Sequence, residues 1–326
     1  MKQKNFSIGV IGVGHLGEYH VKHLKTIKKS QLIGIFDSNS KRASIISERY
    51  GVDNFNSQSE LIEKCDAISI VTPTESHYKV AKTCLKCGKH VFVEKPITAN
   101  VRDANELIDL AIKRRLILQV GHIERINPAL LALSDYKLDP KYIEIQRLAP
   151  YSVRGTDVPV VLDKMIHDLD ILLSLVKAPL KEIHADGLSI LTESIDMAHA
   201  RISFQNNTIA NITSSRIAKE DIRKVKLFQK NLYCTLDLLK GSAEIYEIDS
   251  NSNSNIKVPF EYKGKQKTIT YTKPIIKDFD PLRQELKNFI NSIAGKEKPI
   301  VDGINARNAL ALAIKINKLI LKNLID

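Results

Sequence analysis

This sequence has no long apolar run and few cysteines. The first absence argues against a membrane-spanning protein, and the second argues against a zinc protein. None of the 326 residues belongs to an apolar run of the roughly 18 residues that a transmembrane helix needs, so we expect no membrane span. The four cysteines include a single C-x-x-C pair, Cys84 and Cys87. A zinc site needs two more ligands at suitable spacing, and none follows, so we expect no metal. We expect reduced structural cysteines, with a redox role of the pair as the alternative.

The sequence also shows no compact cluster of positive charge, and we expect its first residues to form a strand and not a signal peptide. The net charge is +12, but the lysines are scattered and form no compact basic run, so we expect no nucleic-acid partner. This charge indicates either a solvated lysine surface or a field that attracts an anionic ligand. The first apolar run leads into a glycine motif without a small-residue cleavage site, which indicates a first strand and a cytoplasmic protein.

The order of the predicted elements indicates two domains. In residues 1–122, strand-like segments alternate with helical ones, which is typical of an α/β Rossmann domain with a doubly wound parallel sheet. Residues 123–326 hold a helical stretch at 160–176, then several strands with no helix between them, and two final helices. We therefore expect an α+β domain with an open, mainly antiparallel sheet, including a hairpin at Asn206 and Asn207. The polar stretch 250–255 predicts a loop.

A glycine motif after the first strand predicts a dinucleotide site. The motif G-x-G-x-x-G follows a strand and opens a helix within a strand–helix–strand unit. Gly12 permits the tight turn, Gly14 lets a pyrophosphate approach the backbone, and Gly17 lets the helix pack closely on the strand. N–H groups at the helix N-terminus can bind the phosphates. The residues that we expect to bind the cofactor here are Gly12, Gly14, His15, Leu16 and Gly17.

The cofactor that this pattern predicts is NAD. Asp37 ends the next strand, 20 residues after Gly17. Its carboxylate can accept hydrogen bonds from both ribose hydroxyls of NAD and would repel the 2′-phosphate of NADP. Lys41 and Arg42 follow shortly afterwards, so NADP is not excluded.

Polar residues end two later strands of the same domain. Thr72, Pro73 and His77 follow one strand, and Glu94 and Lys95 end another. Ligands of open α/β sheets bind at the carboxyl ends of the strands, so we expect Thr72, Pro73, His77 and Glu94 to bind the cofactor. Glu94 and Lys95 should lie near the nicotinamide. A lysine there can polarise a carbonyl or stabilise an alkoxide.

Asp163 and His167 form a candidate acid–base pair in the second domain. They are four residues apart in a helical stretch, which predicts that they share one face. A histidine ordinarily titrates near neutrality, as a general base or acid requires. Asp163 could orient the ring or contact the substrate.

The order of these motifs resembles the Gfo/Idh/MocA family, which includes glucose–fructose oxidoreductase and inositol dehydrogenase. The motifs are G-x-G-x-x-G, an acid, T-P-x-x-x-H, E-K-P and D-x-x-x-H, and they extend through the chain. The resemblance implies an NAD-dependent oxidation of a sugar hydroxyl. It implies that Lys95 and His167 are catalytic, that Asp163 assists in the substrate site, and that the peptide bond before Pro96 is cis.

Residues 120–133, 147–170 and 214–229 resemble a bacterial subgroup of this family that includes UDP-N-acetylglucosamine 3-dehydrogenases. This resemblance implies a UDP-sugar as substrate, whose diphosphate needs cationic partners. The candidate substrate-binding residues are Arg125, Asn127, Arg154 and Thr156, although the arginines could instead form interdomain ion pairs.

Two other functions stay open. The first is a dehydrogenase of a free polyol or sugar. The second is a non-catalytic protein that senses a nucleotide or sugar, although such a protein would have no need of Lys95 or His167. We expect the second domain to bind the substrate and, through the apolar outer face of its sheet, to form a homodimer or homotetramer.

Overall fold

The chain folds into two compact units in the computed structural model, which describes residues 5–152, 158–249, 256–276 and 279–324. The first unit comprises residues 1–123 and 280–311, and the second comprises 124–279 and 312–326. This grouping differs from the expected single second domain at 123–326, because helix α8 (Pro281–Ile293) and the start of α9 (Gly303–Asn323) belong to the first unit.

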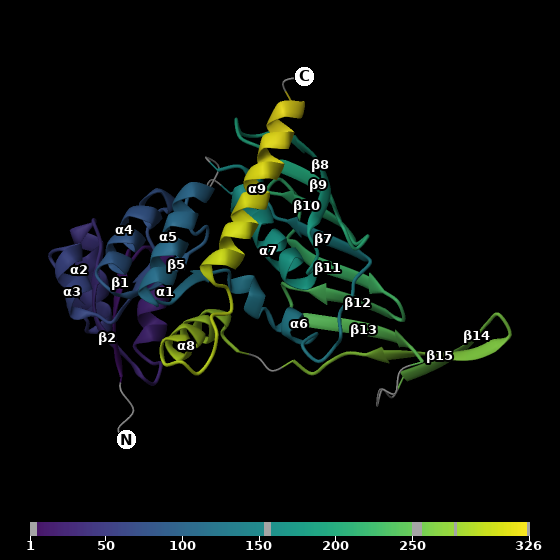
Figure 1. Cartoon of the computed structure of the whole chain (residues 1–326), viewed down its shortest axis with the longest axis horizontal. Coiled ribbons are helices and arrows are strands. Elements are labelled where there is room, and N and C mark those ends of the chain that lie inside the picture. Colours follow the sequence, from purple (N-terminus) through teal and green to yellow (C-terminus); the bar gives the residue numbers. More distant parts are fainter. Residues whose placement is uncertain (1–4, 153–157, 250–255, 277–278, 325–326) are drawn as a thin grey trace. The chain divides into compact units, whose positions relative to one another are not determined.

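The first unit, coloured purple to blue at the start of the chain in Figure 1, has a six-stranded parallel sheet. The strand order is β3-β2-β1-β4-β5-β6. Its strands are β1 (Phe6–Ile11), β2 (Ser30–Phe36), β3 (Asp53–Asn54), β4 (Ala67–Ile70), β5 (His90–Glu94) and β6 (Leu118–Gly121). Every residue of β4 is buried, as expected of a parallel strand with helices on both faces. The strand order reverses between β1 and β4, where doubly wound sheets bind their ligands. The predicted Rossmann architecture is therefore confirmed.

Side-chain caps begin three of the first five helices of this unit. The helices are α1 (His15–Leu24), α2 (Ser40–Tyr50), α3 (Gln58–Lys64), α4 (Thr74–Lys86) and α5 (Val101–Arg114). Asn39, Ser57 and Asn100 each accept a hydrogen bond from the backbone N–H three residues later, and so cap α2, α3 and α5. Gly51 caps the C-terminus of α2, with a φ of 58° in the left-handed region.

Helix α8 completes the first unit although it lies far along the chain. Its buried Leu286 and Phe289 join the core cluster of β1, β5 and α1. The rings of Phe289 and Phe92 meet edge to face with centroids 5.7 Å apart. The order of elements along the sequence could not reveal this return to the first sheet.

A nine-stranded sheet forms the second unit, in the order β14-β15-β13-β12-β11-β7-β10-β9-β8. Its strands are β7 (Tyr142–Leu148), β8 (Leu180–Leu188), β9 (Met197–Phe204), β10 (Ile209–Ser215), β11 (Ile222–Gln229), β12 (Leu232–Asp237), β13 (Ser242–Ile248), β14 (Ile256–Tyr262) and β15 (Lys265–Thr272). Among the described strands, β7 and β10 pair in parallel and the other neighbours are antiparallel, which confirms the mainly antiparallel sheet. The hairpin at Asn206 and Asn207 is confirmed, with Asn207 at a φ of 63°. Strands β7, β13 and β14 were not predicted, and the loop predicted at 250–255 lies outside the described residues.

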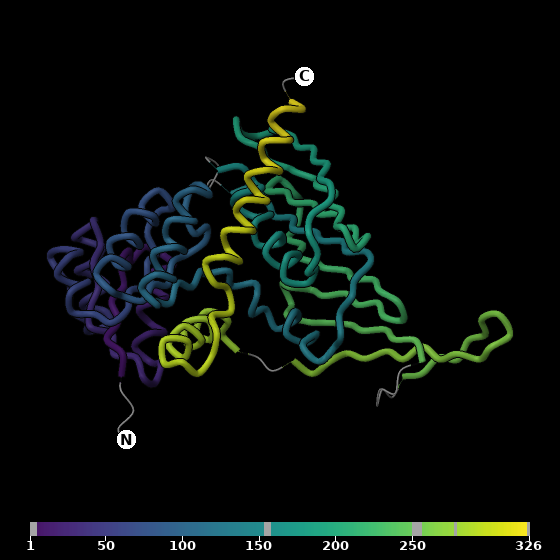
Figure 2. The backbone as a smooth tube through the Cα atoms, viewed as in Figure 1, coloured from purple at the N-terminus to yellow at the C-terminus, as the bar shows by residue number. Residues whose placement is uncertain are grey.

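A row of aromatic rings crosses the outer face of this sheet. Neighbouring ring centroids lie 4.6 to 5.7 Å apart along the row, which consists of Tyr142, Phe228, Tyr233, Tyr246 and Tyr271. At one edge of the sheet, β14 and β15 extend outward as a long hairpin (Figure 2).

Short helices lie on the other face of the sheet. They are a 3₁₀ turn η1 (Ile123–Ile126), α6 (Pro128–Leu131), a π-helical turn η2 (Val161–Met165) and α7 (Ile166–Leu175). The helix predicted at 160–176 is thus present, but its first turn is π-helical. In the described part of the chain, none of the helices combines the length and apolar character needed to cross a membrane.

Candidate active site

The glycine motif forms the tight turn that was predicted at the end of β1. Gly12 has a φ of 88°, and a Cβ there would lie 2.6 Å from the carbonyl oxygen of Val71. A Cβ on Gly17 would lie 2.1 Å from the carbonyl oxygen of Gly12, so α1 can pack on the turn only with glycine there. Gly14 is the N-cap of α1 and has no side chain to occupy the N–H groups of the first turn. These groups are suited to bind phosphate.

A cavity of about 390 Å³ lies beside this turn. Among the predicted cofactor residues it brings together Gly12, Gly14, Asp37, Thr72 and Pro73. The hydroxyl oxygen of Thr72 is buried and has no hydrogen-bond partner among the described residues. A buried hydroxyl normally has a partner, so this one is suited to a ligand group. The lining of the cavity therefore suits the ribose and phosphate groups of a dinucleotide.

The carboxylate of Asp37 is held in a fixed orientation. Its Oδ2 accepts a hydrogen bond from the Val13 N–H at 2.7 Å, and its Oδ1 accepts one from the Asn39 N–H at 2.8 Å. Each oxygen has a further lone pair for a ribose hydroxyl. Arg42 also lines the cavity and donates from Nη1 to the carbonyl of Val13 at 3.4 Å, so the residue that could favour NADP lies in the same cavity.

Other predicted cofactor residues lie outside the lining of this cavity. His15 and Leu16 are exposed on the first turn of α1. His77 is buried, and its two ring nitrogens contact the carbonyl oxygens of Thr72 and Pro96. The Glu94 carboxylate contacts the ring of His20. The sequence motif could not show that His77 and Glu94 have these partners within the protein.

Lys95 directly follows β5 and is partly exposed. Its backbone N–H donates to Oε2 of Glu94 at 3.3 Å. The peptide bond between Lys95 and Pro96 is cis, as the family resemblance implied. Lys95 thus ends a buried strand at the carboxyl edge of the sheet, where ligands of this fold bind.

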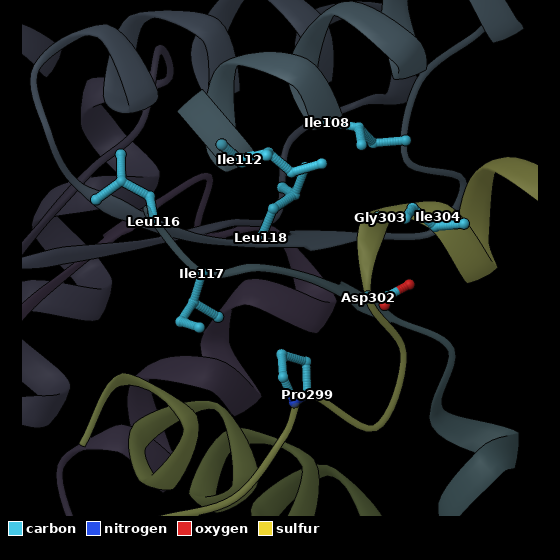
Figure 3. Close-up of a pocket in the computed structure, with 10 residues that line it drawn as sticks. Ile108, Ile112, Leu116, Ile117, Leu118, Pro299, Asp302, Gly303 and Ile304 are labelled. Carbon is cyan, nitrogen blue, oxygen red and sulfur yellow. The ribbon is translucent and has the colours of Figure 1, made fainter. Parts of the chain in front are cut away.

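A second hollow of the first unit has a different character. It measures about 140 Å³ and is lined by aliphatic side chains of α5 and β6 and by the start of α9 (Figure 3). The carboxylate of Asp302 in this lining accepts a hydrogen bond from the Asn305 N–H and so caps α9. The residues that line this hollow include no cationic side chain and no glycine turn that could bind a phosphate. We therefore do not assign the cofactor to it.

In the second unit, Asp163 and His167 lie in different kinds of helix. Asp163 is in the π-helical turn, and its Oδ2 lies 3.8 Å from the ammonium of Lys164. His167 is half-buried in the first turn of α7. A π-helical turn inside a helix often marks a functional site. The prediction that the two residues share one face assumed a regular α-helix. In the structure, the turn that contains Asp163 is π-helical and therefore wider.

The predicted substrate-binding residues have structural partners where they are described. Nε of Arg125 donates to Asp170 at 3.0 Å, and burial raises the pKa of that carboxyl to about 6 against the attraction of Arg125. Asn127 is buried, donates to Glu124 and to the carbonyl of Leu238, and caps α6 with its amide oxygen. Arg154 and Thr156 lie outside the described residues.

A buried ionic network beside His167 was missed by the sequence analysis. Arg147 on β7 makes a two-pronged bond to Asp168 on α7 and donates to Glu124 at 2.8 Å. All three side chains are almost fully buried. The network fastens the helix of His167 to the sheet. No local pattern marks Arg147, because it occupies an inward position of a strand that was not predicted.

Known proteins resemble the chain over most of its length. The sequence model of the Gfo/Idh/MocA oxidoreductase family, an NAD-binding Rossmann fold, matches residues 6–122. UDP-N-acetylglucosamine 3-dehydrogenase of Acidithiobacillus ferrooxidans is 36% identical over 309 residues, which cover 94% of this chain and 95% of that enzyme. The chain belongs to the Gfo/Idh/MocA oxidoreductase family.

Two further comparisons describe its place in the family. A crystal structure of the Acidithiobacillus enzyme has a TM-score of 0.87 at 34% identity and covers 97% of this chain and 98% of that one. Myo-inositol 2-dehydrogenase of Thermotoga maritima is 25% identical, with 95% of each chain covered. The predictions of an NAD-binding oxidoreductase that acts on CH–OH groups are confirmed.

Proposed function

We propose that this enzyme oxidises a hydroxyl of a UDP-sugar, with UDP-N-acetylglucosamine as the first candidate. The observation that carries the proposal is the 36% identity to a UDP-N-acetylglucosamine 3-dehydrogenase over 94% of the chain, against 25% identity to a myo-inositol 2-dehydrogenase over a similar length. A net charge of +12 suits a substrate with two anionic phosphates.

NAD, when bound, supplies the acceptor of a hydride from the carbinol carbon, and the carbinol becomes a ketone. In the proposed step, His167 accepts the proton of the hydroxyl group. Lys95 stabilises the negative charge that develops on the oxygen, which a cation does best when it is fixed in place beforehand. Asp163 assists in the substrate site. Asp37 accepts hydrogen bonds from the ribose hydroxyls of the cofactor, and the N–H groups of the turn around Gly14 bind its phosphates.

A free polyol is the second candidate substrate, because myo-inositol 2-dehydrogenase of T. maritima resembles the chain over 95% of both lengths. A polyol has no phosphate, so it gains nothing from a positively charged protein.

The assay that separates the candidates measures NADH formed from UDP-N-acetylglucosamine, myo-inositol and glucose in parallel. A carbonyl-trapping reagent is included because the equilibrium can favour the alcohol. We expect NADH with UDP-N-acetylglucosamine. NADH with myo-inositol alone would refute the sugar-nucleotide substrate, and NADH with none of the three would refute both candidates.

We also propose that the outer face of the second sheet binds a second copy of the chain. The aromatic row lies there, and Phe228 in it is 39% exposed. The four tyrosines of the row are partly exposed, and apolar surface gathered on one face favours association. Sedimentation should show an oligomer for the parent and a lighter species for Phe228→Glu. An unchanged sedimentation coefficient would place the contact elsewhere.

A further inference from the structure

His20 on α1 contacts the end of β5 from one side. Its ring is fully buried, with Nδ1 2.8 Å from the hydroxyl of Ser69 and Nε2 3.2 Å from Oε1 of Glu94. If the serine hydroxyl donates to Nδ1, then the proton lies on Nε2 and is donated to Glu94. This ring thereby fixes the residue immediately before Lys95.

The Glu94 carboxylate also has little space in which to move. Gly121 is its partner on β6, and a Cβ on Gly121 would lie 2.6 Å from Oε1 of Glu94 and 2.9 Å from Oε2. The carboxylate therefore lies flat against the backbone of β6. Its second oxygen accepts the backbone N–H of Lys95 at 3.3 Å, which couples the position of Glu94 to the backbone of Lys95.

His77 on α4 contacts the same turn from the other side. Its Nδ1 lies 2.8 Å from the carbonyl oxygen of Pro96, and its Nε2 lies 2.8 Å from the carbonyl oxygen of Thr72. A neutral ring donates to one of these carbonyls at a time, and a protonated ring donates to both. This ring thus connects the residue after Lys95 with Thr72, which lines the cofactor cavity.

We propose that His20 and His77 are positioning residues that hold the Glu94–Lys95–Pro96 turn from both sides, so that the Lys95 ammonium is presented in a fixed place. His20 acts through Glu94. His77 acts through Pro96 and also aligns Thr72 for the cofactor. The inference rests on one part of the proposed function, namely that Lys95 takes part in the reaction.

Paired amide substitutions test this inference, because asparagine and glutamine each replace one ring nitrogen. Glutamine places its amide nitrogen near Nε2 of the histidine, and asparagine places it near Nδ1. His20→Gln can therefore keep the Glu94 contact, and His20→Asn cannot. At His77 the assignment differs, because His77→Asn can keep the Pro96 contact and His77→Gln can keep the Thr72 contact.

Three measurements are made on each full-length variant. They are the turnover of UDP-N-acetylglucosamine, the affinity for NADH by fluorescence titration, and the rate at which the Lys95 amine reacts with a labelling reagent, followed by mass spectrometry of its peptide. We expect His20→Asn and His77→Gln to lose about tenfold or more in turnover, the scale of a misplaced catalytic group, and to change the labelling rate of Lys95. The turnover of His20→Gln should stay within about threefold of the turnover of the parent. The chief effect of His77→Asn should be weaker binding of NADH.

A matched control is available on the same helix as His20. His23 is also buried on α1, but its Nε2 pairs with Asp280 at 3.1 Å and has no contact with the turn. His23→Asn should therefore lower stability without changing the labelling rate of Lys95. An equal change of that rate in His23→Asn, or equal effects of asparagine and glutamine at both positions, would overturn the inference.

Gly121→Ala gives a second route if a histidine variant does not fold. The added methyl group pushes the Glu94 carboxylate away, so it should reproduce the His20→Asn labelling change while both histidines remain. A parent-like labelling rate in Gly121→Ala would overturn the role of Glu94. The labelling and NADH measurements need no substrate, so they decide the inference even if UDP-N-acetylglucosamine is not oxidised.

Discussion

Asp37 lies where its carboxylate can discriminate between the two nicotinamide cofactors. Its oxygens are fixed by the N–H groups of Val13 and Asn39, and Arg42 lines the same cavity. We expect kcat/KM for NAD to exceed that for NADP by at least about tenfold, which corresponds to about 1.4 kcal/mol. Kinetics with both cofactors check this. Arg42→Ala should lower the remaining NADP activity more than Lys41→Ala does, and a tenfold preference for NADP would mean that the cations dominate.

Lys95 carries the most direct prediction about the chemical step. Lys95→Ala should leave NADH binding unchanged and lower turnover by roughly two to four powers of ten, the range typical of a positioned acid–base group. Lys89 precedes the same strand and donates to the carbonyl of Glu63, so Lys89→Ala is the matched control. Turnover of Lys95→Ala within about threefold of the parent would remove this lysine from the mechanism.

Helix α7 depends on ion pairs that are buried against its sheet. Arg147→Met leaves Asp168 and Glu124 as buried carboxylates without their main cation, so we expect the free energy of unfolding to fall by about 3–5 kcal/mol. Arg223 also pairs with Glu124, at 3.4 Å, but its side chain is 41% exposed. Arg223→Met should cost less than about 1 kcal/mol in urea denaturation. If the free energy of unfolding fell equally in the two variants, the burial of Arg147 would not make its ion pairs more important for stability.

Two histidines of the first unit, His77 on α4 and His90 on β5, should make its stability sensitive to mild acid. Burial lowers the pKa of both His77 and His90, so the folded chain binds these two protons less readily than the unfolded chain. Their contribution to stability is therefore present above about pH 6.5 and is lost as the pH falls through the lowered values. Thermal unfolding should show a falling Tm of the first unit between about pH 6.5 and 5.

His90→Asn should flatten this pH dependence, because it removes one of the titrating rings. His199 is exposed on β9, so His199→Asn serves as the control and should leave the profile as it is. A parent Tm that rises as the pH falls through this range would contradict the prediction.

At the scale of the whole molecule, the net charge of +12 should make substrate binding sensitive to salt. Attraction between exposed charges is screened over about 8 Å at physiological ionic strength. KM for a UDP-sugar should therefore rise with added salt, and kcat should change less, because a remote phosphate contact stabilises ground and transition states alike. Steady-state kinetics over a salt series test this, and a KM independent of salt would argue for an uncharged substrate.

The parts of the molecule that sequence could predict are those with local causes. The turn at Gly12 and Gly17 follows from backbone clashes that any side chain would create, and a hairpin at Asn207 follows from its left-handed backbone. The buried partner of Arg147 and the return of α8 to the first sheet depend on contacts between residues far apart along the chain. His77 shows the same limit within the site, because its motif is visible but its bonds to Thr72 and Pro96 need the folded turn.

The aromatic row on the second sheet gives this protein a distinctive optical signal. The chain has no tryptophan and ten tyrosines, and four of those tyrosines stand in the row with Phe228 between two of them. Rings held at fixed angles produce near-ultraviolet circular dichroism, which disappears when tertiary packing is lost. That signal should report chiefly on the nine-stranded sheet, while the fluorescence of bound NADH reports on the parallel one. Each half of the molecule can thus be followed as it unfolds, without attaching a probe to either.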